Sequence, residues 1–327
     1  MENENNTHTF SQENTTVSAL VLKMQEQMSK VIVGQYEMLE LLLAALLAEG
    51  HVLIEGVPGV AKTLTAKLMA KMLSVPFSRI QFTPDLMPSD VTGTSVFNAQ
   101  TTTFQFRQGP IFANIVLIDE INRAPAKTQA SLFEVMEERQ VTIDGFSYKM
   151  QAPFMVLATQ NPIEHEGTYR LPEAQLDRFL MKINVGYPTL EDEIKILTQQ
   201  NTKPIAELVQ QVVALVSAAE LVDAQQQVRK VFVEEKIIAY IAQIVFETRN
   251  DRALYVGASP RASIALLNVS KAIAVIRGRN FLIPEDVAYA ALPVLRHRIS
   301  LTPEREMEGS TADEVLKEIL KKIEIPR

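Results

Sequence analysis

The stretch LIEGVPGVAKTLTAK, residues 53–67, has the residue types and spacing of a phosphate-binding loop with one departure. Gly56, Lys62 and Thr63 match the pattern G-x-x-x-x-G-K-[ST], but Ala61 stands where the pattern has its second glycine. In such a loop, backbone N–H groups converge on an anion at a helix start, the lysine contacts the β and γ phosphates, and the hydroxyl binds Mg²⁺. The stretch therefore predicts a nucleotide site, with a chance strand–turn–helix as the alternative.

Two adjacent carboxylates, Asp119 and Glu120, end the hydrophobic run NIVLIDE. A buried strand would carry them at a high cost in free energy unless they served a site. At the carboxyl end of a parallel sheet they would project into the ligand crevice beside the phosphate loop. We expect Asp119 to hold hydrated Mg²⁺ and Glu120 to polarise the attacking water as general base. The alternative is a pair of exposed acids that cap the next helix.

A third apolar run, FMVLATQNP, ends in Asn161. An asparagine at this strand end can orient the lytic water by hydrogen bonding, and the alternative is a turn residue before Pro162. Three strand ends with the expected polar residues, in the expected order, are less probable by chance than any one of them.

The elements that must position these residues alternate between strands and helices. Short apolar runs, typical of strands buried on both faces, occur at 51–56, 77–82, 114–120, 153–162 and 179–185. Helical patterns separate these runs, so we predict an α/β fold with a parallel sheet flanked by helices. Segments 93–109 and 139–151 are typical of β-hairpins, the second with the turn residues Asp144-Gly145.

Helical periodicity covers residues 17–48, with a break at VIVGQ (31–35), and returns after Pro188. We predict a disordered polar start at 1–16, an α/β core with N-terminal helices at 17–187, and a smaller all-helical domain at 188–327. The first sixteen residues lack the basic and apolar regions of a signal peptide, and we expect no export.

Composition excludes several classes of site. The 327 residues include no cysteine, so disulfides and Cys-ligated metals are excluded, and the four scattered histidines (8, 51, 165 and 297) have no zinc spacing. A net charge of −7 and the lack of a long Lys/Arg run argue against non-specific nucleic-acid binding. The most apolar run, 41–48, is too short to span a bilayer, so we expect a soluble, cytoplasmic protein.

The motifs GVPGVAKT, IVLIDEINRAP, SLFEVMEERQVTIDG, VLATQNPIEHEGTYRLPEAQLDRF and GASPRAS resemble those of the MoxR branch of the AAA+ ATPases. The resemblance covers roughly residues 20–300, and the motifs are long and in order. It implies a P-loop AAA+ core followed by a helical lid domain, with ATP and Mg²⁺ as ligands. In that family alanine is common at the position of Ala61.

The resemblance also implies assembly as a ring, usually a hexamer, with nucleotide between subunits. Arg178 matches the arginine finger given to a neighbour, and Arg261 matches the sensor-2 arginine that reaches back from the lid. Guanidinium groups suit a γ-phosphate whose charge shifts during transfer. The alternatives are a salt bridge of Arg178 with Asp177 or Glu173, and a solvated helix residue for Arg261. Arg123 and Arg170 are further interface candidates, although the family more often has proline in place of Arg170.

Val33 and Gly34 in VIVGQ resemble the segment that packs on adenine in this superfamily, and a helix corner is the alternative. The residues expected to contact ATP are Val33, Gly34, Gly56, Pro58, Gly59, Val60, Ala61, Lys62, Thr63 and Leu64. The hairpin at 93–109 resembles the helix-2 insert of the clade that includes magnesium chelatase, and the one at 139–151 the hairpin before sensor 1. Each hairpin can contact a substrate or partner, or serve packing alone.

The function that follows is Mg²⁺-dependent ATP hydrolysis with Glu120, Asn161, Arg178 and Arg261 as catalytic residues and Thr63 and Asp119 at the metal. The resemblance implies chaperone-like remodelling, assembly or metal-cofactor insertion in client proteins, often with a von Willebrand factor A domain partner. The alternatives are a nucleotide-switched scaffold with little turnover and a magnesium-chelatase-like motor subunit. A DNA-acting motor is disfavoured by the net charge. We expect neither nucleic-acid binding nor membrane insertion.

Ala61 also gives a conformational expectation. The residue before the lysine should take a left-handed conformation, so that its N–H joins the anion-binding nest. Alanine in that conformation costs on the order of 1 to 2 kcal/mol. Charge-assisted hydrogen bonds to phosphate, each worth roughly 1.5 to 3 kcal/mol, can offset this cost.

Overall fold

A five-stranded parallel sheet forms the centre of the protein. The computed structural model describes residues 17–57, 59–161, 169 and 171–326. The strands follow the order β2-β5-β8-β1-β9, with every neighbouring pair parallel. They span β1 (Val52–Gly56), β2 (Phe77–Gln81), β5 (Ile115–Asp119), β8 (Met155–Gln160) and β9 (Met181–Val185). The predicted parallel sheet is confirmed, and its strands lie within the five apolar runs.

Strand β5 is apolar up to its last residue because both faces of the sheet are covered there. In β5, Ile115 and Leu117 face one hydrophobic core, whereas Val116 and Ile118 face another. This is the period of two expected of a strand, since successive side chains point to opposite faces. A single strand therefore contributes side chains to both cores, and in β5 only the last residue is polar.

Helices cover the two faces. The helical residues 17–29, α2 (Tyr36–Leu47) and α3 (Lys62–Met72) belong to the first core, and α5 (Ala126–Glu138) belongs to the second with α4 (Pro88–Thr92). The short helix η1 (Ile121–Arg123) follows β5, and α6 (Glu173–Leu176) precedes β9. Among the described residues, no helix is long and apolar enough to cross a membrane.

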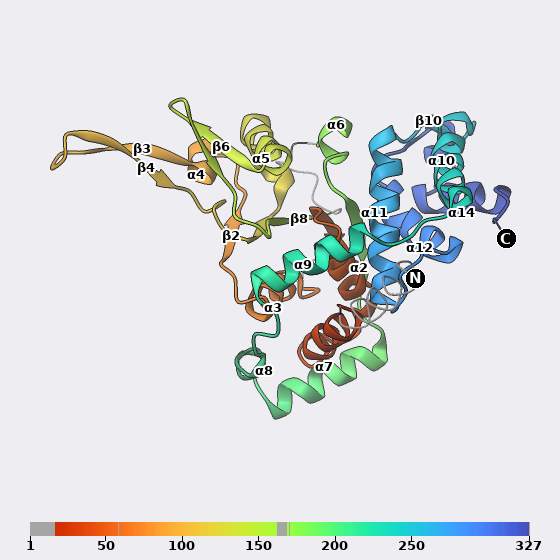
Figure 1. The fold of residues 1–327 in the computed structure, drawn as a ribbon, viewed down its shortest axis with the longest axis horizontal. Coiled ribbons are helices and arrows are strands. Elements are labelled where there is room, and N and C mark those ends of the chain that lie inside the picture. Colours follow the sequence, from red (N-terminus) through yellow and green to blue (C-terminus); the bar gives the residue numbers. More distant parts are fainter. Residues whose placement is uncertain (1–16, 58, 162–168, 170, 327) are drawn as a thin grey trace, which may run out of the picture.

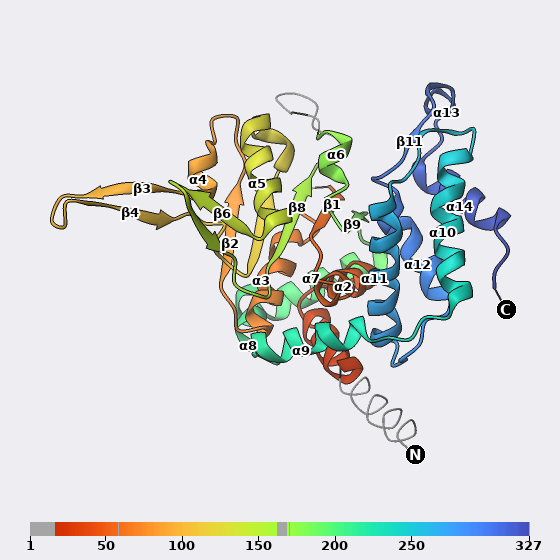
Figure 2. The same ribbon diagram turned by 45° about the horizontal axis from the view of Figure 1, so that its top comes forward.

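Two antiparallel hairpins stand outside the sheet, as predicted. They comprise β3 (Gly93–Asn98) with β4 (Thr103–Gln108), and β6 (Gln140–Ile143) with β7 (Phe146–Lys149). The first projects far from the body of the molecule (Figure 2). Phe106 of β4 packs on Tyr148 of β7, with ring centroids 4.2 Å apart, so the two hairpins support each other.

Helices dominate the chain after β9. They are α7 (Leu190–Thr202), α8 (Ile205–Gln211), α9 (Ala218–Arg229), α10 (Glu235–Asn250), α11 (Pro260–Ile276), α12 (Pro284–Leu295), α13 (Pro303–Met307) and α14 (Ala312–Lys322). The expectation of a purely helical second part is wrong in one detail, because β10 (Leu254–Val256) and β11 (Ser300–Leu301) form a short antiparallel pair. Strands of two and three residues are too short to show a periodicity in the sequence.

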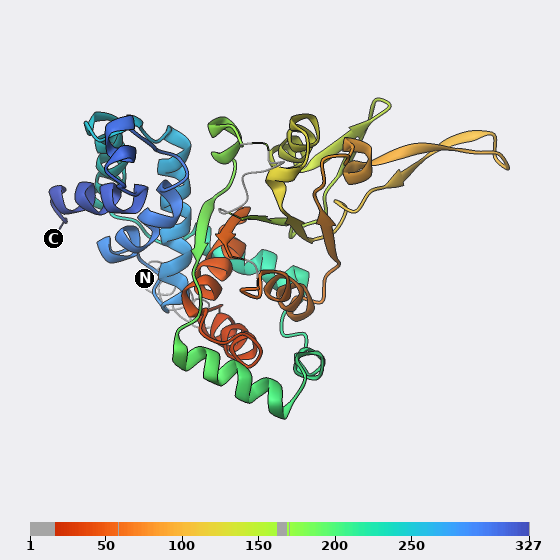
Figure 3. The same cartoon turned by 180° about the vertical axis from the view of Figure 1, so that it is seen from behind.

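The segment α7–α9 carries the chain around the core before the last helices begin (Figures 1 and 3). Gln199 of α7 donates to the carbonyl of Lys30, and the backbone N–H of Leu215 donates to the carbonyl of Met72. The C-terminal helices then pack beside β9, where Arg296 donates to the carbonyl of Lys182 at 3.3 Å. The change from strands to helices falls between β9 and α7, around Pro188. The domain division there stays a prediction, and the predicted polar start at 1–16 lies outside the described residues.

Candidate nucleotide site

The phosphate-type loop joins the carboxyl end of β1 to the first residue of α3, Lys62. Lys62 Nζ donates to the carbonyl of Gly56 at 2.7 Å, so the lysine side chain lies back over the loop. Gly56 has no room for a side chain, because a Cβ there would lie 2.5 Å from the carbonyl oxygen of Val185. Ala61 has φ 60° and ψ 17°, which confirms the expected left-handed conformation. Pro58 lies outside the described residues.

The loop residues divide between packing and exposure. Val60 is buried in the first core, so its backbone, and not its side chain, is the part that can face an anion. Gly59 is exposed, and its φ of 90° is a backbone conformation that residues with an L side chain rarely adopt. Thr63 and Leu64 lie in the first turn of α3, and both are half-buried. A helix start with this approach is a favourable site for a phosphate.

Asp119 ends β5 and is 8% exposed. Its Oδ2 accepts from Arg79 Nε at 2.6 Å, and its Oδ1 accepts from the Thr159 hydroxyl at 3.2 Å. Thr159 Oγ1 in turn accepts from the backbone N–H of Glu120 at 3.1 Å. This chain of hydrogen bonds fixes the two acids relative to β8.

Glu120 has a left-handed backbone, with φ 57° and ψ 53°, and its carboxylate faces the β2 side of the crevice. Its Oε2 accepts from Gln81 Nε2 at 2.8 Å and from Arg123 Nε at 3.1 Å. The Glu120 side chain makes no capping bond to η1, so the alternative of acids that cap the next helix is wrong. Arg123, a candidate for the subunit interface, lies here beside Glu120.

Sequence reasoning missed Arg79, Gln81 and Thr159. Arg79 and Gln81 lie two residues apart on the edge strand β2, and Gln81 is in register with Asp119. In the run FSRIQF, Arg79 and Gln81 stand at i and i+2, and residues with this spacing point to the same face of a strand. That alternation was the available signal, but which strand β2 would pair with is not encoded locally.

Asn161 follows the last residue of β8. Because β8 lies between β5 and β1, Asn161 is placed between the acids and the phosphate-type loop, at the same edge of the sheet. Gln160 is in register with Glu55, one residue before Gly56. The order of the strands therefore brings together all three predicted polar strand ends.

A cavity of about 220 Å³ lies at the carboxyl end of β9, next to β1 in the sheet. Gly34, Met38, Gly186 and Tyr187 are among its lining residues. Gly34 has φ 76°, and a side chain there would meet Asp192 of α7. Val33, also expected at a nucleotide base, is not in the lining of this cavity.

Arg178 and Arg261 lie near the amino ends of the strands, on the side of the sheet opposite to the phosphate-type loop. Arg178 comes just before β9, and β9 runs parallel to β1 with Met181 opposite Val52. The phosphate-type loop is at the other end of β1, on the order of 15 Å away along a five-residue strand. Both arginines instead line a cleft of about 470 Å³ with Gly50 and His51, which directly precede β1.

One carboxylate receives both arginines. Arg178 Nε donates to Glu137 Oε2 at 2.7 Å, and Arg261 donates from a terminal nitrogen to Glu137 Oε1 at 2.7 Å. Arg261 therefore lies where the C-terminal helices pack beside β9, and its match to the sensor-2 arginine stays a prediction. The partner of Arg178 is Glu137, and neither Asp177 nor Glu173 takes that place. Arg170 lies outside the described residues.

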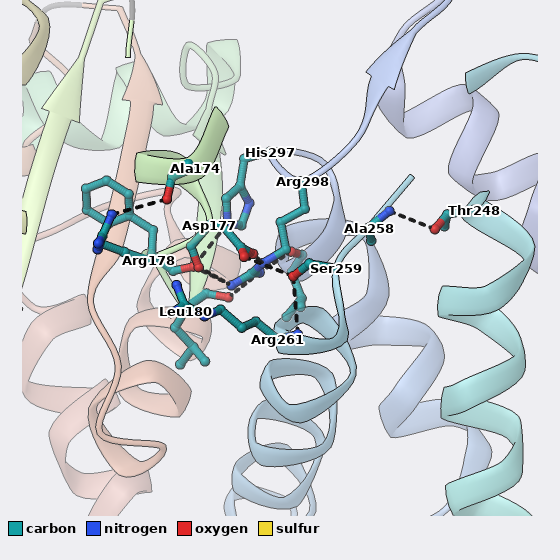
Figure 4. A network of polar contacts seen from close by, with 12 residues as sticks. Ala174, Asp177, Arg178, Leu180, Thr248, Ala258, Ser259, Arg261, His297 and Arg298 are labelled. Atoms are coloured by element: carbon teal, nitrogen blue, oxygen red, sulfur yellow. Dashed lines mark hydrogen bonds and ion pairs between the residues drawn. The ribbon is translucent and has the colours of Figure 1, made fainter. Parts of the chain in front are cut away.

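A polar junction beside the two arginines joins the core to the C-terminal helices (Figure 4). Arg298 Nε donates to Asp177 Oδ1 at 2.7 Å, and the Ser259 hydroxyl donates to Asp177 Oδ2 at 2.9 Å. Arg298 also donates to the backbone carbonyls of Phe179, at 2.6 Å, and Leu180, at 3.0 Å. Ser259 caps α11, which carries Arg261 in its first turn.

Comparisons with known proteins agree with this architecture. Residues 51–181 match the family described as ATPase family associated with various cellular activities (AAA), and residues 246–319 match an AAA lid domain. A solved structure from Cytophaga hutchinsonii, named as a candidate ATPase, superposes with a TM-score of 0.90 and 39% identity, covering 98% of this chain and 99% of that one.

Two relatives align along nearly all of the chain. The Bacillus subtilis protein YeaC is 46% identical over 94% of this chain and 95% of its own length. Chaperone MoxR1 of Mycobacterium tuberculosis is 44% identical over 92% of this chain and 81% of its own length. Together with the matched ATPase core and lid, these identities show that the chain belongs to the MoxR family of AAA+ ATPases.

Proposed function

We propose that the chain binds ATP with Mg²⁺ at the carboxyl edge of its sheet and hydrolyses it. The observation that carries this proposal is the convergence of three neighbouring strand ends. β1 leads to Lys62 at a helix start, β5 ends in Asp119 and Glu120, and β8 leads to Asn161 between them. A ligand crevice at the carboxyl ends of parallel strands is the usual place for nucleotide in such folds.

The oxygen donors present suit Mg²⁺, which prefers carboxylates, hydroxyls, water and phosphate oxygens. Thr63 and Asp119 would hold it, and the ion would neutralise charge on the outer phosphates. Among the described residues no three Asp, Glu or His side chains gather into a metal site. We therefore assign one carboxylate and one hydroxyl from the protein, with phosphate and water as the other ligands.

Glu120 is the proposed general base. Its carboxylate is exposed to the crevice and is anchored by Gln81 and Arg123, so it can accept a proton from a water oriented by Asn161. Lys62 would exchange its contact with Gly56 for the β and γ phosphates. The cavity beside Gly34 is the proposed site of the adenine base, and its position at the end of β9, which pairs with β1, supports this.

The site of one chain is incomplete without a second copy. Arg178 and Arg261 lie at the amino edge of the sheet, so they can act only on a nucleotide held by a neighbouring chain. A head-to-tail contact that brings this edge to the next chain's loop closes into a ring when repeated. We propose such a ring, with six subunits as the family resemblance implies, in which each chain supplies the arginines for the next.

The ring would act on other proteins. The name of Chaperone MoxR1 supports a chaperone-like role for this chain, and we propose remodelling or assembly of protein clients in the cytoplasm. Metal-cofactor insertion and a von Willebrand factor A domain partner follow from the family resemblance. A nucleotide-switched scaffold is the competing function, and turnover distinguishes the two.

The test is steady-state ATPase activity of the full chain and of Glu120→Gln, with Glu138→Gln as a control that removes the same charge from an exposed position. We expect Glu120→Gln to lose at least about a hundred-fold in kcat and to retain ATP binding, as for a lost general base. Glu138→Gln should keep the parent rate. Equal turnover of Glu120→Gln and the parent chain would contradict the role of Glu120 as general base and would favour the nucleotide-switched scaffold.

A further inference from the structure

Glu137 lies in the last turn of α5, where the helix dipole disfavours a carboxylate. Its two oxygens are divided between two arginines from different parts of the chain. Oε2 accepts from Arg178, which lies between α6 and β9, and Oε1 accepts from Arg261, in the first turn of α11. Both distances are 2.7 Å, within the range of charge-assisted hydrogen bonds.

The cluster of Arg178, Glu137 and Arg261 has the charge and the exposure that an anion-binding site needs. The side chains of Arg178, Glu137 and Arg261 are 29%, 35% and 56% exposed, so all three can be reached from outside the chain. The hydrogen bond from Arg178, above all, lowers the pKa of Glu137, and Glu137 is ionised at neutral pH. Two guanidinium groups and one carboxylate leave a net positive charge at the rim of the cleft.

Most of the donors of the two arginines face elsewhere than Glu137. Each guanidinium has five N–H groups in a fixed fork. In the described part of the chain, Glu137 takes one from each arginine, and the carbonyl of Ala174 takes one more from Arg178 at 3.3 Å. Glu137 can therefore keep its contact with both arginines while they donate to phosphate oxygens.

The backbone that bears the two arginines is also fixed. Asp177 directly precedes Arg178, and it binds both Arg298 and Ser259, the cap of the helix that carries Arg261 (Figure 4). This junction sets the backbones, but the long side chains would repel each other as like charges without an acid between them. Glu137 supplies that acid.

We propose that Glu137 is a positioning residue, which holds Arg178 and Arg261 as one clamp for the outer phosphates of a nucleotide bound by the neighbouring subunit. This inference rests on the proposed function, since it assumes hydrolysis at a site shared between two chains. In this role Glu137 acts through the two cations, which it preorganises for the phosphates.

The first test is the ATPase activity of Glu137→Gln in the full chain. The amide keeps the size of the side chain and loses the charge that draws both arginines together. We expect kcat to fall by at least about ten-fold and the KM for ATP to stay within about two-fold, because the loop that binds ATP is at the other edge of the sheet. Glu138→Gln, one residue further on, is the matched control and should be unchanged in both, and thermal unfolding should give the two variants similar midpoints.

The second test exploits the sharing of the site, by mixing Glu137→Gln with Glu120→Gln. Each variant is deficient alone, but a Glu137→Gln loop beside a Glu120→Gln neighbour has every group intact. A random one-to-one ring contains about a quarter of such interfaces, so activity should rise toward a quarter of the parent rate. A folding defect in Glu137→Gln would not be rescued in this way.

Arg178→Ala mixed with Glu120→Gln is the reference for the shared site itself. If that mixture recovers activity while Glu137→Gln alone has the parent kcat, the role of Glu137 is wrong and the shared site stands. A Glu137→Gln kcat above the parent value would overturn the inference as well, because Glu137 would then be a competitor for the arginines. If the Arg178→Ala mixture does not recover, the shared site fails, and the role of Glu137 fails with it.

Discussion

Arg298 of the lid and Asp177 of the core form a nearly enclosed ion pair, with Nε 2.7 Å from Oδ1 and the Arg298 side chain 3% exposed. The remaining donors of Arg298 reach backbone carbonyls of the segment that enters β9, including those of Phe179 and Leu180. An enclosed arginine with this many partners joins the core to the lid on this side of the sheet.

We expect Arg298→Met to lower the free energy of unfolding by about 3 to 5 kcal/mol, because it leaves the Asp177 carboxylate without its main counter-charge. Arg305→Met is the control, since Arg305 pairs with Glu308 at an exposed place on the lid and should cost less than about 1 kcal/mol. Urea unfolding of both variants measures the difference. Adding Asp177→Asn to Arg298→Met should cost far less than Asp177→Asn does alone, and fully additive costs would show that the pair is not coupled.

Ala61 gives a prediction on the loop. Its φ of 60° is a left-handed conformation that glycine adopts without strain and a β-branched residue adopts with difficulty. We expect Ala61→Gly to keep the Kd for ATP within about three-fold of the parent, and Ala61→Val to weaken it at least about ten-fold. Titration calorimetry in the Glu120→Gln background avoids turnover. Loss of ATP binding by Ala61→Gly would contradict the assignment of a tolerated alanine.

The burial of His51 predicts that stability depends on pH. This residue directly precedes β1 and is 5% exposed. Its Nδ1 accepts from the backbone N–H of Val156 at 3.0 Å, so the proton of the neutral ring is on Nε2 and points to the carbonyl of Met136 at 3.1 Å. Burial lowers the pKa of His51 from 6.5 to about 4. The unfolded chain therefore takes up a proton below pH 6.5 that the folded chain refuses until about pH 4.

Stability should accordingly fall as the pH drops from 7 to 5, by about 2 kcal/mol for His51 alone. His297, whose pKa burial also lowers, adds a loss of the same sign. His51→Gln lacks the titrating group, and its loss between pH 7 and pH 5 should be smaller than that of the parent by about 2 kcal/mol. Urea unfolding at the two pH values gives both differences, and equal losses would show that His51 titrates normally in the folded chain.

The sequence was sufficient for the sheet because its signals are local. The central strands β5 and β8 are largely apolar on both faces, and polar residues stand where these strands stop, as in Asp119 and Asn161. Ala61 could be assigned a left-handed conformation since its place in the loop pattern requires one. The strand order then brings these ends together without further information.

The arginines could not be placed in the same way. Where Arg261 lies depends on how α7–α9 wrap around the core, and α7 and α8 bury no residue completely, so their packing leaves little periodicity to read. Glu137 meets Arg178 across 41 residues of chain and Arg261 across 124. Such contacts are set by the packing of whole elements, which a motif does not encode.

Arg79 offers a test of whether its ion pair with Asp119 must break before Mg²⁺ binds. Its Nε lies 2.6 Å from Asp119 Oδ2, an oxygen that we assign to the ligand shell of Mg²⁺, and its side chain is 51% exposed. The ion pair and the cation compete for one carboxylate. We expect Arg79→Met to lower the Mg²⁺ concentration for half-maximal ATPase activity by about two- to five-fold, the range for an exposed pair.

Arg107→Met is the control for this last prediction, because it removes the same charge from the exposed face of the β4 hairpin. It should leave the Mg²⁺ requirement unchanged. A rise in the Mg²⁺ requirement of Arg79→Met would mean that Arg79 helps to bind the metal–nucleotide complex through its phosphates, and competition at Asp119 would be the wrong account. A fall confined to Arg79→Met is the result expected if the Arg79 guanidinium and the cation compete for the Asp119 carboxylate.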